Sequence, residues 1–255
     1  MTAPSRVVLV TGAASGIGFA ISEHLALEGH HVILSDVNIT AAEQAVEQLR
    51  AKGCSVEAWA LNVASQSDIE KTQAKFSQVD ILINNAGLQY VAKLEDFPVE
   101  KWRLLNDVLL VGPAMLTRAF LPTMKANNFG RIINIGSIHA VVASPFKSAY
   151  VAAKHGIVGF SKVVALETAE FDITINSICP SYVKTALVEH QISQQAAQHG
   201  ISEDQVINTI MLEPMPKKSF ISFAELAGTV SYLISPAARN MTGQNLVLDG
   251  GWTVK

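Results

Sequence analysis

The sequence contains little of the material from which disulfide-rich and zinc-binding proteins are built. Only two of its 255 residues are cysteine, Cys54 and Cys179, and they lie far apart with no Cys-x-x-Cys pair and no histidine cluster. Such a pattern indicates neither a disulfide framework nor a metal site. We therefore expect two buried thiols and no bound metal.

Charged residues are also scarce, at 16% of the chain, and the net charge is −3. The basic residues are scattered along the sequence. A scattered arrangement gives no basic patch for nucleic acid or for an anionic membrane. No uninterrupted apolar run approaches the length of a membrane span, and the run 7–10 is too short for a signal peptide. We expect a cytoplasmic protein that binds small molecules or copies of itself.

The chain is instead rich in hydrophobic residues, at 49%, and no Pro/Ser-rich or charged linker divides it. We expect a single domain, 1–255, whose short β-branched runs alternate with helical patterns. This alternation predicts a doubly wound parallel α/β sheet. The irregular stretch 182–219 predicts a substrate lid. The expected strands are 6–10, 31–35, 55–61, 80–84, 131–135, 174–178 and 246–249.

Two sequence patterns mark the starts of helices. Thr40 with Glu43, and Ser222 with Glu225, have the spacing of capping boxes. A long helical region is also expected between the fourth and fifth strands, over 98–125.

The first strand leads into a glycine-rich loop that is followed by a helical pattern. Gly12, Gly16 and Gly18 let the backbone turn tightly and approach a pyrophosphate, whose charge is favoured by the N–H groups at the helix start. The strand before and the helix after make this a nucleotide-binding pattern. Asp36 follows about 20 residues later and is placed to bind the adenosine ribose. A turn or helix-capping role for Asp36 is the alternative.

The ends of the next two strands complete the expected nucleotide site. Asn62 and Val63 follow the third strand and are expected to face the adenine. Asn85, Ala86 and Gly87 follow the fourth strand, where a small backbone can lie against the cofactor.

A candidate catalytic group follows the fifth strand. Ser137 comes directly after 131–135, at the edge where open α/β sheets bind ligands. Tyr150 and Lys154 stand four residues apart in an Ala-rich helical pattern, so they share one face. A phenol has a pKa of about 10 and exchanges protons at neutral pH only when a nearby cation favours the phenolate. Lys154 is that cation.

These motifs together resemble the short-chain dehydrogenase/reductase family over nearly the whole chain. Thr11-Gly-x-x-x-Gly-x-Gly18, Asn84-Asn-Ala-Gly87, Ser137 and Tyr150-x-x-x-Lys154 match its pattern. The resemblance implies a Rossmann-type fold in which Tyr150 is the acid/base, Lys154 lowers its pKa and holds the nicotinamide ribose, and Ser137 hydrogen-bonds the substrate oxygen. It also implies cofactor contacts for Ser15, Ile17, Pro180, Val183 and Thr185.

Within that family, segments such as Glu95-Asp-Phe-Pro and Asp249-Gly-Gly-Trp-Thr253 resemble bacterial D-3-hydroxybutyrate dehydrogenases. This resemblance implies NAD as cofactor, interconversion of D-3-hydroxybutyrate and acetoacetate, and a homotetramer. Two alternatives remain open: a carbonyl reductase for another short hydroxy acid or acyl thioester, and a catalytically weak nucleotide-sensing protein. The residues expected to bind the carboxylate of the hydroxy or keto acid are Gln89, His139, Lys147 and Gln191.

Three positions depart from the family pattern. Leu109 stands where most members have an asparagine that helps to hold a proton-relay water, and Asn106 is one helical turn away. Asn62 replaces an aspartate near the adenine, and Ser181 replaces a glycine after Pro180. These departures leave the relay in question and the rest of the pattern intact.

Overall fold

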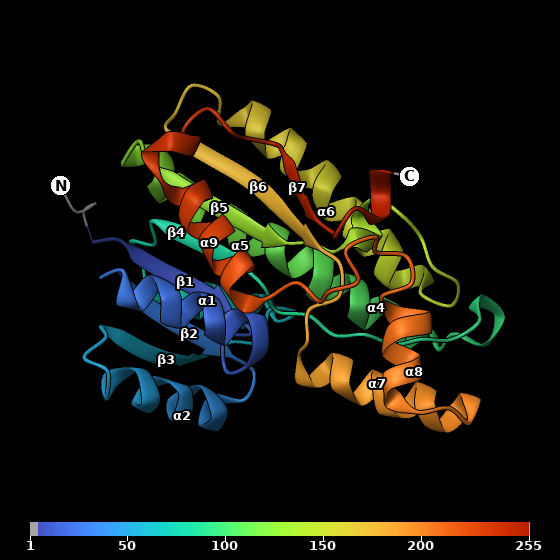
Figure 1. Ribbon diagram of the computed structural model, residues 1–255. Coiled ribbons are helices and arrows are strands. Elements are labelled where there is room, and N and C mark those ends of the chain that lie inside the picture. The colour runs from blue at the N-terminus through green and yellow to red at the C-terminus, as the bar shows by residue number, and fades with distance from the viewer. Residues whose placement is uncertain (1–4, 255) are drawn as a thin grey trace.

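The protein is described by a computed structural model that covers residues 5–254. These residues form a seven-stranded sheet in the order β3-β2-β1-β4-β5-β6-β7, with every neighbouring pair parallel (Figure 1). The predicted doubly wound parallel sheet is therefore confirmed. Its strands are β1 (Val7–Thr11), β2 (His31–Asp36), β3 (Val56–Ala60), β4 (Ile81–Asn84), β5 (Gly130–Ile135), β6 (Ile173–Pro180) and β7 (Asn245–Leu248).

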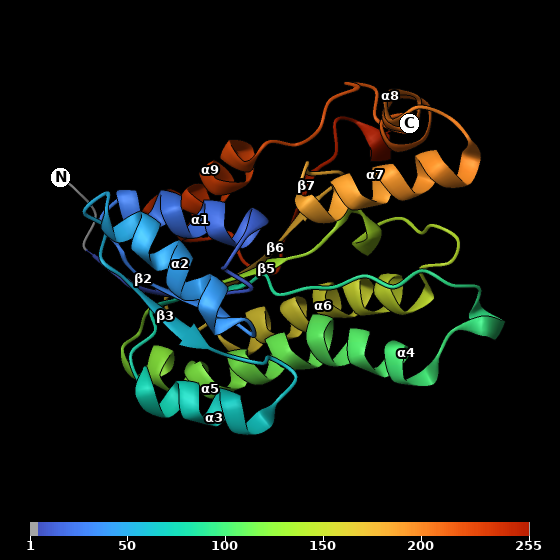
Figure 2. The same cartoon turned by 90° about the horizontal axis from the view of Figure 1, so that it is seen from below.

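Helices cover both faces of the sheet (Figure 2). They include α1 (Gly16–Leu27), α2 (Ile39–Arg50) and α9 (Phe223–Ile234) on one face, and α3 (Gln66–Lys75), α5 (Gly112–Ala126) and α6 (Ser148–Glu167) on the other. Alternate strand residues face opposite sides: Val10 and Ile83 pack with α1, α2 and α9, whereas Leu9 and Leu82 pack with α3, α5 and α6. Both faces are therefore buried, as expected from continuous apolar strands.

The helix starts agree with the sequence patterns in one case and differ in the other. Ser222 and Glu225 form the predicted capping box at α9. At α2 the prediction is wrong, because the Asn38 side chain accepts a hydrogen bond from the Ala41 amide and the helix begins at Ile39, one residue before Thr40. Short 3₁₀ turns occur at Leu94–Asp96, Ile138–Ala140, Pro236–Ala238 and Trp252–Val254.

The region 99–126 is a continuous helix in three parts: α4 (Val99–Asn106), a π-helical segment η2 (Asp107–Val111), and α5. Contrary to our expectation, it has the length and composition of a membrane span. The expectation considered uninterrupted apolar runs, and here the apolar residues are interspersed with polar ones. Leu116, Phe120 and Met124 are buried in the cluster beside the sheet, as in a core helix.

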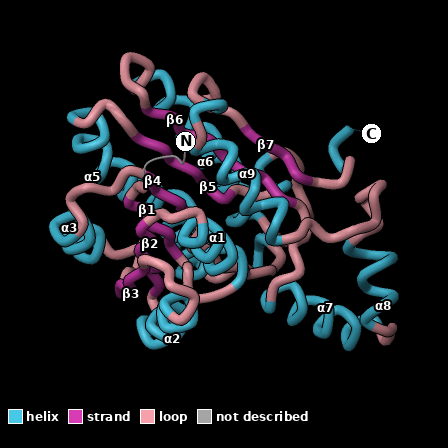
Figure 3. The backbone as a smooth tube through the Cα atoms, turned by 60° about the vertical axis from the view of Figure 1, so that its left-hand side comes forward, coloured by secondary structure: helices cyan, strands magenta, loops and turns pink. Residues whose placement is uncertain are grey.

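The expected lid is more regular than its sequence indicated. It contains the 14-residue helix α7 (Ala186–His199), the short α8 (Glu203–Val206) and a π-helical segment Ile207–Met211. Ile192, Val206 and Met211 form its own small core. In Figures 1 and 3, α7 and α8 project from the sheet, apart from the helices that cover its faces.

Candidate active site

A cavity of about 660 Å³ runs along the carboxyl ends of the strands β1 to β6. Its volume lies within the usual range for sites that bind small molecules and cofactors. It is found where strand order reverses between β1 and β4, the place expected for a ligand in an open α/β sheet. The predicted cofactor, catalytic and carboxylate-binding residues all line it except Gly16 and Gly18.

The glycine loop is shaped by close packing as well as by the cavity. Gly12 has a φ of +62°, and a Cβ there would lie 2.8 Å from Ala86 Cα. A Cβ on Gly18 would lie 2.3 Å from the Gly12 carbonyl oxygen, so Gly18 allows the helix to approach the loop. Gly16 has a φ of +57° and turns the chain into α1. Gly16 and Gly18 therefore shape the loop, while Gly12 also forms the cavity wall.

The start of α1 is open to the cavity. Ser15 occupies the N-cap position and makes no side-chain cap, whereas Ser65, Thr185 and Ser222 cap their helices. The first turn of α1 also contains no acidic residue. Unpaired N–H groups and the helix dipole favour an anion at such a helix start. A dinucleotide's pyrophosphate fits this place.

Asp36 ends β2 and lines the cavity. Its two carboxylate oxygens accept hydrogen bonds from the backbone amides of Ala14, at 3.2 Å, and Asn38, at 3.0 Å. The alternative turn role is thus present, and each oxygen can still accept a further bond from a ribose hydroxyl. Nearby, Asn62 Oδ1 accepts from the Ala64 amide at 3.0 Å, which fixes that side chain on the cavity wall.

The loop after β4 is tied to the glycine loop by Thr11, to which the sequence analysis gave no role beyond its place in the motif. Thr11 Oγ1 accepts hydrogen bonds from the backbone amides of Asn85 and Ala86, both at 3.0 Å. Asn85 Nδ2 in turn donates to the carbonyl oxygens of Thr11 and Gly12. The Asn85 side chain therefore joins the two loops, which fixes Ala86 and Gly87 at the cavity.

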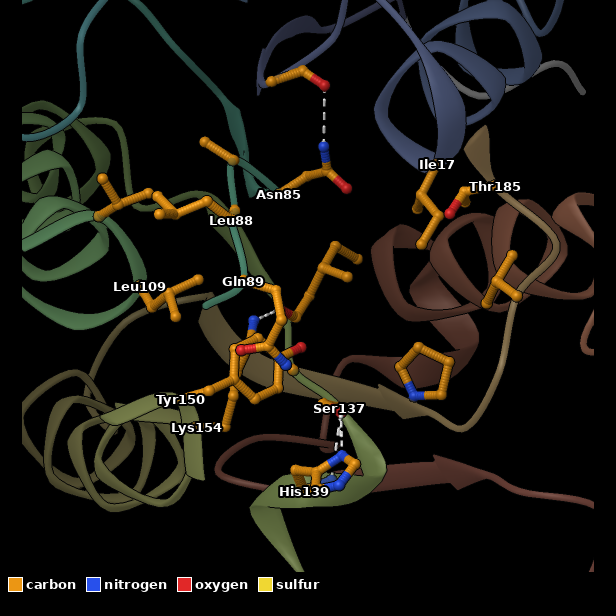
Figure 4. A pocket seen from close by; sticks show the side chains of 18 of the residues that line it. Ile17, Asn85, Leu88, Gln89, Leu109, Ser137, His139, Tyr150, Lys154 and Thr185 are labelled. Carbon is orange, nitrogen blue, oxygen red and sulfur yellow. Dashed lines mark hydrogen bonds between the residues drawn. The ribbon is translucent and has the colours of Figure 1, made fainter. Parts of the chain in front are cut away.

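The predicted catalytic residues lie together in the middle of the cavity (Figure 4). Ser137 follows β5 and is 8% exposed, while Tyr150 and Lys154 project from the first turns of α6. The Lys154 ammonium donates to the Ile135 carbonyl oxygen at 2.6 Å and lies 5.7 Å from the centroid of the Tyr150 ring. The helix spacing and the end of β5 bring these three side chains to one point.

Burial controls the acid–base properties of this group. It lowers the pKa of Lys154 to about 8. It raises the pKa of Tyr150, and a smaller, opposite contribution from hydrogen bonding with Ser137 lowers this pKa. The expected lowering of the Tyr150 pKa by Lys154 is therefore not found in the protein alone, because loss of hydration of the phenolate dominates.

His139 and Lys147 lie at the expected substrate end of the cavity. Burial, with smaller contributions from Lys147 and His155, lowers the pKa of His139 to about 4, so its imidazole is neutral at pH 7. Its Nε2 lies 2.8 Å from Ser144 Oγ, and its Nδ1 lies 3.4 Å from Ser137 Oγ. Burial also lowers the pKa of Lys147, and an anion beside it would favour its charged form.

An apolar wall that the sequence analysis did not identify faces these polar groups. It includes Leu88, Leu104 and Val108, of which the last two are one helical turn apart. That spacing is the signal that could have identified them. Tyr182 also lines the cavity and stacks on Trp252, with ring centroids 6.1 Å apart.

The departures from the family pattern have definite positions. Leu109 lines the cavity within η2 and is 2% exposed. Asn106 does not line it, and its amide donates to the Trp102 carbonyl oxygen at 2.9 Å, so it does not substitute for the missing asparagine. The Ser181 hydroxyl lies 3.3 Å from Met215 Sδ, near the base of the lid.

No metal-binding cluster of three or more His, Cys, Asp or Glu side chains occurs within residues 5–254. Both cysteines are free, and Cys179 is buried as expected, whereas the expectation is wrong for Cys54, which is half-buried. The polar groups of the cavity instead suit a dinucleotide and a small polar substrate.

The family model described as short chain dehydrogenase matches residues 6–196. The chain belongs to this family. The fold, the glycine loop and the grouping of Ser137, Tyr150 and Lys154 agree with that membership.

Relatives in the short chain dehydrogenase family extend the comparison to nearly the full chain. A D-beta-hydroxybutyrate dehydrogenase of Rhizobium meliloti (strain 1021) is 44% identical, covering 98% of this chain and 100% of the relative. A protein of the same name from Cupriavidus necator is 41% identical, covering 98% of each. The crystal structure of an actinorhodin polyketide ketoreductase variant with NADPH has a TM-score of 0.90 at 30% identity and covers 97% of each chain.

Proposed function

We propose that the protein is an NAD-dependent 3-hydroxybutyrate dehydrogenase that reversibly oxidises D-3-hydroxybutyrate to acetoacetate. One observation carries the proposal: a single cavity is lined by Asp36, by the group of Ser137, Tyr150 and Lys154, and by Lys147. The names of the relatives at 44% and 41% identity support the choice of substrate.

The residues of the cavity divide the reaction between them. NAD, when bound, supplies the acceptor for the hydride of the substrate carbon. The Tyr150 phenolate takes the hydroxyl proton as general base, and Ser137 donates a hydrogen bond to the substrate oxygen. Lys154, held by the Ile135 carbonyl, orients the nicotinamide ribose. This division requires the substrate hydroxyl to lie between Ser137 and Tyr150.

The substrate carboxylate binds to a second set of cavity residues, apart from Ser137 and Tyr150, which hold the hydroxyl. Lys147 is the cation, and Gln89 and Gln191 provide donors. Gln191 belongs to α7, so closure of the lid would bring it onto the substrate and exclude water. Charge-assisted hydrogen bonds are stronger than neutral ones, which favours an acid over its ester.

We also propose that the enzyme is a cytoplasmic homotetramer. Apolar side chains on the outer surface support association: Tyr232 of α9 is 46% exposed, Val163 of α6 is 53% exposed, and Leu166 of α6 is 80% exposed. Light scattering in solution tests this assembly through the molar mass, and a monomer would contradict it.

A spectrophotometric screen tests the function. The enzyme is assayed with NAD and with NADP against D- and L-3-hydroxybutyrate, longer 3-hydroxy acids and a 3-hydroxybutyryl thioester. We expect the highest kcat/KM for D-3-hydroxybutyrate with NAD. Preference for the thioester or a longer acid would replace the proposed substrate. Nucleotide binding with no oxidation of any of them would indicate a nucleotide-sensing protein.

A further inference from the structure

Each oxidation leaves a proton on Tyr150, and this proton must reach water before the next turnover. Leu109 places buried methyl groups where the family's relay asparagine stands, and the Asn106 amide is bonded to the Trp102 carbonyl. A leucine side chain cannot hold a water molecule by hydrogen bonding. The proton from Tyr150 therefore needs a route that does not depend on a side-chain amide at position 109.

A different chain of hydroxyl and imidazole groups leads away from Tyr150. Ser137 lines the cavity with Tyr150 and lowers the pKa of the phenol by hydrogen bonding. Ser137 Oγ lies 3.4 Å from His139 Nδ1, and His139 Nε2 lies 2.8 Å from Ser144 Oγ. Figure 4 shows the Ser137 and His139 end of this chain. Ser137 and His139 are buried and line the cavity, whereas Ser144 is half-buried and does not line it, so this series of groups leads from the cavity to a partly exposed hydroxyl outside it.

We propose that His139 relays the proton between Tyr150 and solvent, through Ser137 on one side and Ser144 on the other. The inference rests on the proposed dehydrogenase function. After the keto acid leaves, Tyr150 O–H donates to Ser137 Oγ while Ser137 O–H passes its proton to His139 Nδ1. His139 Nε2–H passes a proton to Ser144, whose own proton goes to water. One proton leaves, and Tyr150 becomes a phenolate. His139 then takes up a proton from water at Nε2 through Ser144 and releases the Nδ1 proton to water in the open cavity, which restores the Nε2–H tautomer for the next turnover.

The surroundings of His139 favour this role over that of a fixed cation. Lys147 and His155 oppose a positive charge on the ring, and burial lowers the pKa of His139 to about 4. The proton therefore passes by exchange of tautomers, without a stable imidazolium. The ring is held edge-on against Tyr150 and Trp252, with centroids 6.0 and 6.4 Å away. The His139 backbone amide also donates to Ser137 Oγ at 3.1 Å, which aligns the serine.

His139→Gln tests the relay, because glutamine keeps hydrogen-bonding groups but cannot exchange tautomers. In weak buffer at pH 7 we expect kcat for oxidation to fall by about tenfold or more, toward the range for lost general acid–base assistance. Added imidazole should restore much of kcat. The matched control is His155→Gln. His155 is an exposed histidine on α6 whose ring bonds the Val151 carbonyl, so its substitution should not lower kcat, and imidazole should not change the kcat of this variant.

A second pair of variants supplies an independent test. Leu109→Asn should raise kcat of His139→Gln by re-opening the amide route, yet change the wild-type enzyme by no more than about tenfold, or 1.4 kcal/mol. Ser144→Ala should lower kcat and leave KM unchanged. Its control is Ser148→Ala, which removes a buried hydroxyl that takes no part in the proposed proton relay and should leave kcat unchanged.

Distinct results overturn the relay and the proposed function. The relay is wrong if His139→Gln keeps kcat within about twofold of wild type, or if KM alone rises and neither imidazole nor Leu109→Asn restores kcat. The latter result would leave His139 as a carboxylate ligand. If the wild-type enzyme oxidises another hydroxy acid, the proposed substrate fails, and the same variants test the relay with that acid.

Discussion

The acid–base chemistry of single residues depends on how deeply they are buried. Lys154 is 6% exposed, and its burial brings its pKa to about 8 while burial raises the pKa of Tyr150. These shifts move the two pKa values apart, because that of Lys154 falls from the ordinary 10.5 and that of Tyr150 rises from the ordinary 10.0. Oxidation needs the phenolate form of Tyr150 as the base. The positive charge of an oxidised nicotinamide in the cavity would favour that form.

Tyr150→Phe should remove nearly all activity and leave NAD binding largely intact, because it deletes one proton-carrying oxygen. General acid–base catalysis contributes roughly 10²–10⁴-fold. The measurement is single-turnover formation of NADH, together with NAD affinity by calorimetry. Tyr232→Phe, a half-exposed phenol on α9, is the control and should behave as wild type. Retention of more than about a tenth of the rate would exclude Tyr150 as the acid/base.

Lys147→Ala should weaken recognition of the acid. We expect a loss of roughly 2–5 kcal/mol in kcat/KM, the range for truncating one partner of a buried charge pair. The methyl ester of 3-hydroxybutyrate should lose much less, since it has no carboxylate. Lys162→Ala, which removes an exposed lysine of α6, is the control. Carboxylate recognition would be refuted if wild-type enzyme oxidised the ester as well as the acid.

At the scale of elements, the glycine loop and the loop after β4 act as one unit, because the Thr11 hydroxyl and the Asn85 amide join them. Gly12→Ala tests this unit. The new Cβ would meet backbone at Ala86, so the loops must separate, and we expect NAD affinity to fall by at least about tenfold.

Gly53→Ala is the matched control for Gly12→Ala. Its φ of +79° gives a comparable backbone strain of about 1–3 kcal/mol, but its Cβ would meet no atom within 4 Å. Urea unfolding should show both variants destabilised, while calorimetry should show lower NAD affinity only for Gly12→Ala. Equal NAD affinities in the two variants would contradict the coupling of the loops.

The strands could be predicted from the sequence. Elements whose presence or first residue depends on tertiary contacts could not. Apolar β-branched runs indicate a buried strand such as 131–135 whatever lies around them. The helix α7 was not predicted, because its polar Gln and His residues give no strong apolar period and its stability comes from packing onto α8. The start of α2 depends on Asn38, which competes with Thr40 for the same turn.

The candidate site shows the same division. Motif spacing identified Ser137, Tyr150 and Lys154, because a helix repeat and a strand end fix their positions locally. The bonds of His139 to Ser137 and Ser144 depend on the path of the loop after β5, which no periodicity encodes. Likewise, the upward shift of the Tyr150 pKa follows from burial by distant segments.

At the scale of the whole molecule, the buried Lys154 makes stability depend on pH. Its pKa is about 8 in the folded protein and 10.5 unfolded, so the unfolded chain binds more protons between these values and stability rises with pH there. From pH 7.5 to 9.5 the free energy of unfolding should rise by about 2 kcal/mol relative to Lys154→Met.

This comparison largely cancels the opposing effects of Tyr150 and Cys179, because burial is the main cause of their raised pKa values in both proteins and the Lys154 charge is only the smallest cause acting on Cys179. Urea unfolding at the two pH values gives the measurement. For Lys162→Met, at an exposed position of the same helix, the free energy of unfolding should change with pH in parallel with that of the wild type. A Lys154→Met curve that is also parallel to wild type would mean that Lys154 is not buried as a cation.

The cavity crosses the molecule from Asp36 to the lid, so cofactor choice is set far from the chemistry. We predict NAD over NADP, because the Asp36 carboxylate would repel a 2′-phosphate. Val37, 75% exposed beside it, and Asn38 offer no cation, and Ser15 of the glycine loop offers none either. The two backbone amides that bond Asp36 hold its charge in place.

Asp36→Ala should therefore raise kcat/KM with NADP while lowering it with NAD, since it removes both the repulsion and the ribose acceptor. Glu43→Ala is the matched control, because it removes an exposed carboxylate of α2 outside the cavity and changes the net charge equally. Steady-state kinetics with both nucleotides at fixed ionic strength give the ratio. An equal or higher wild-type kcat/KM with NADP would refute the preference, and a shift of the ratio in Glu43→Ala as large as that in Asp36→Ala would assign it to net charge instead of to Asp36.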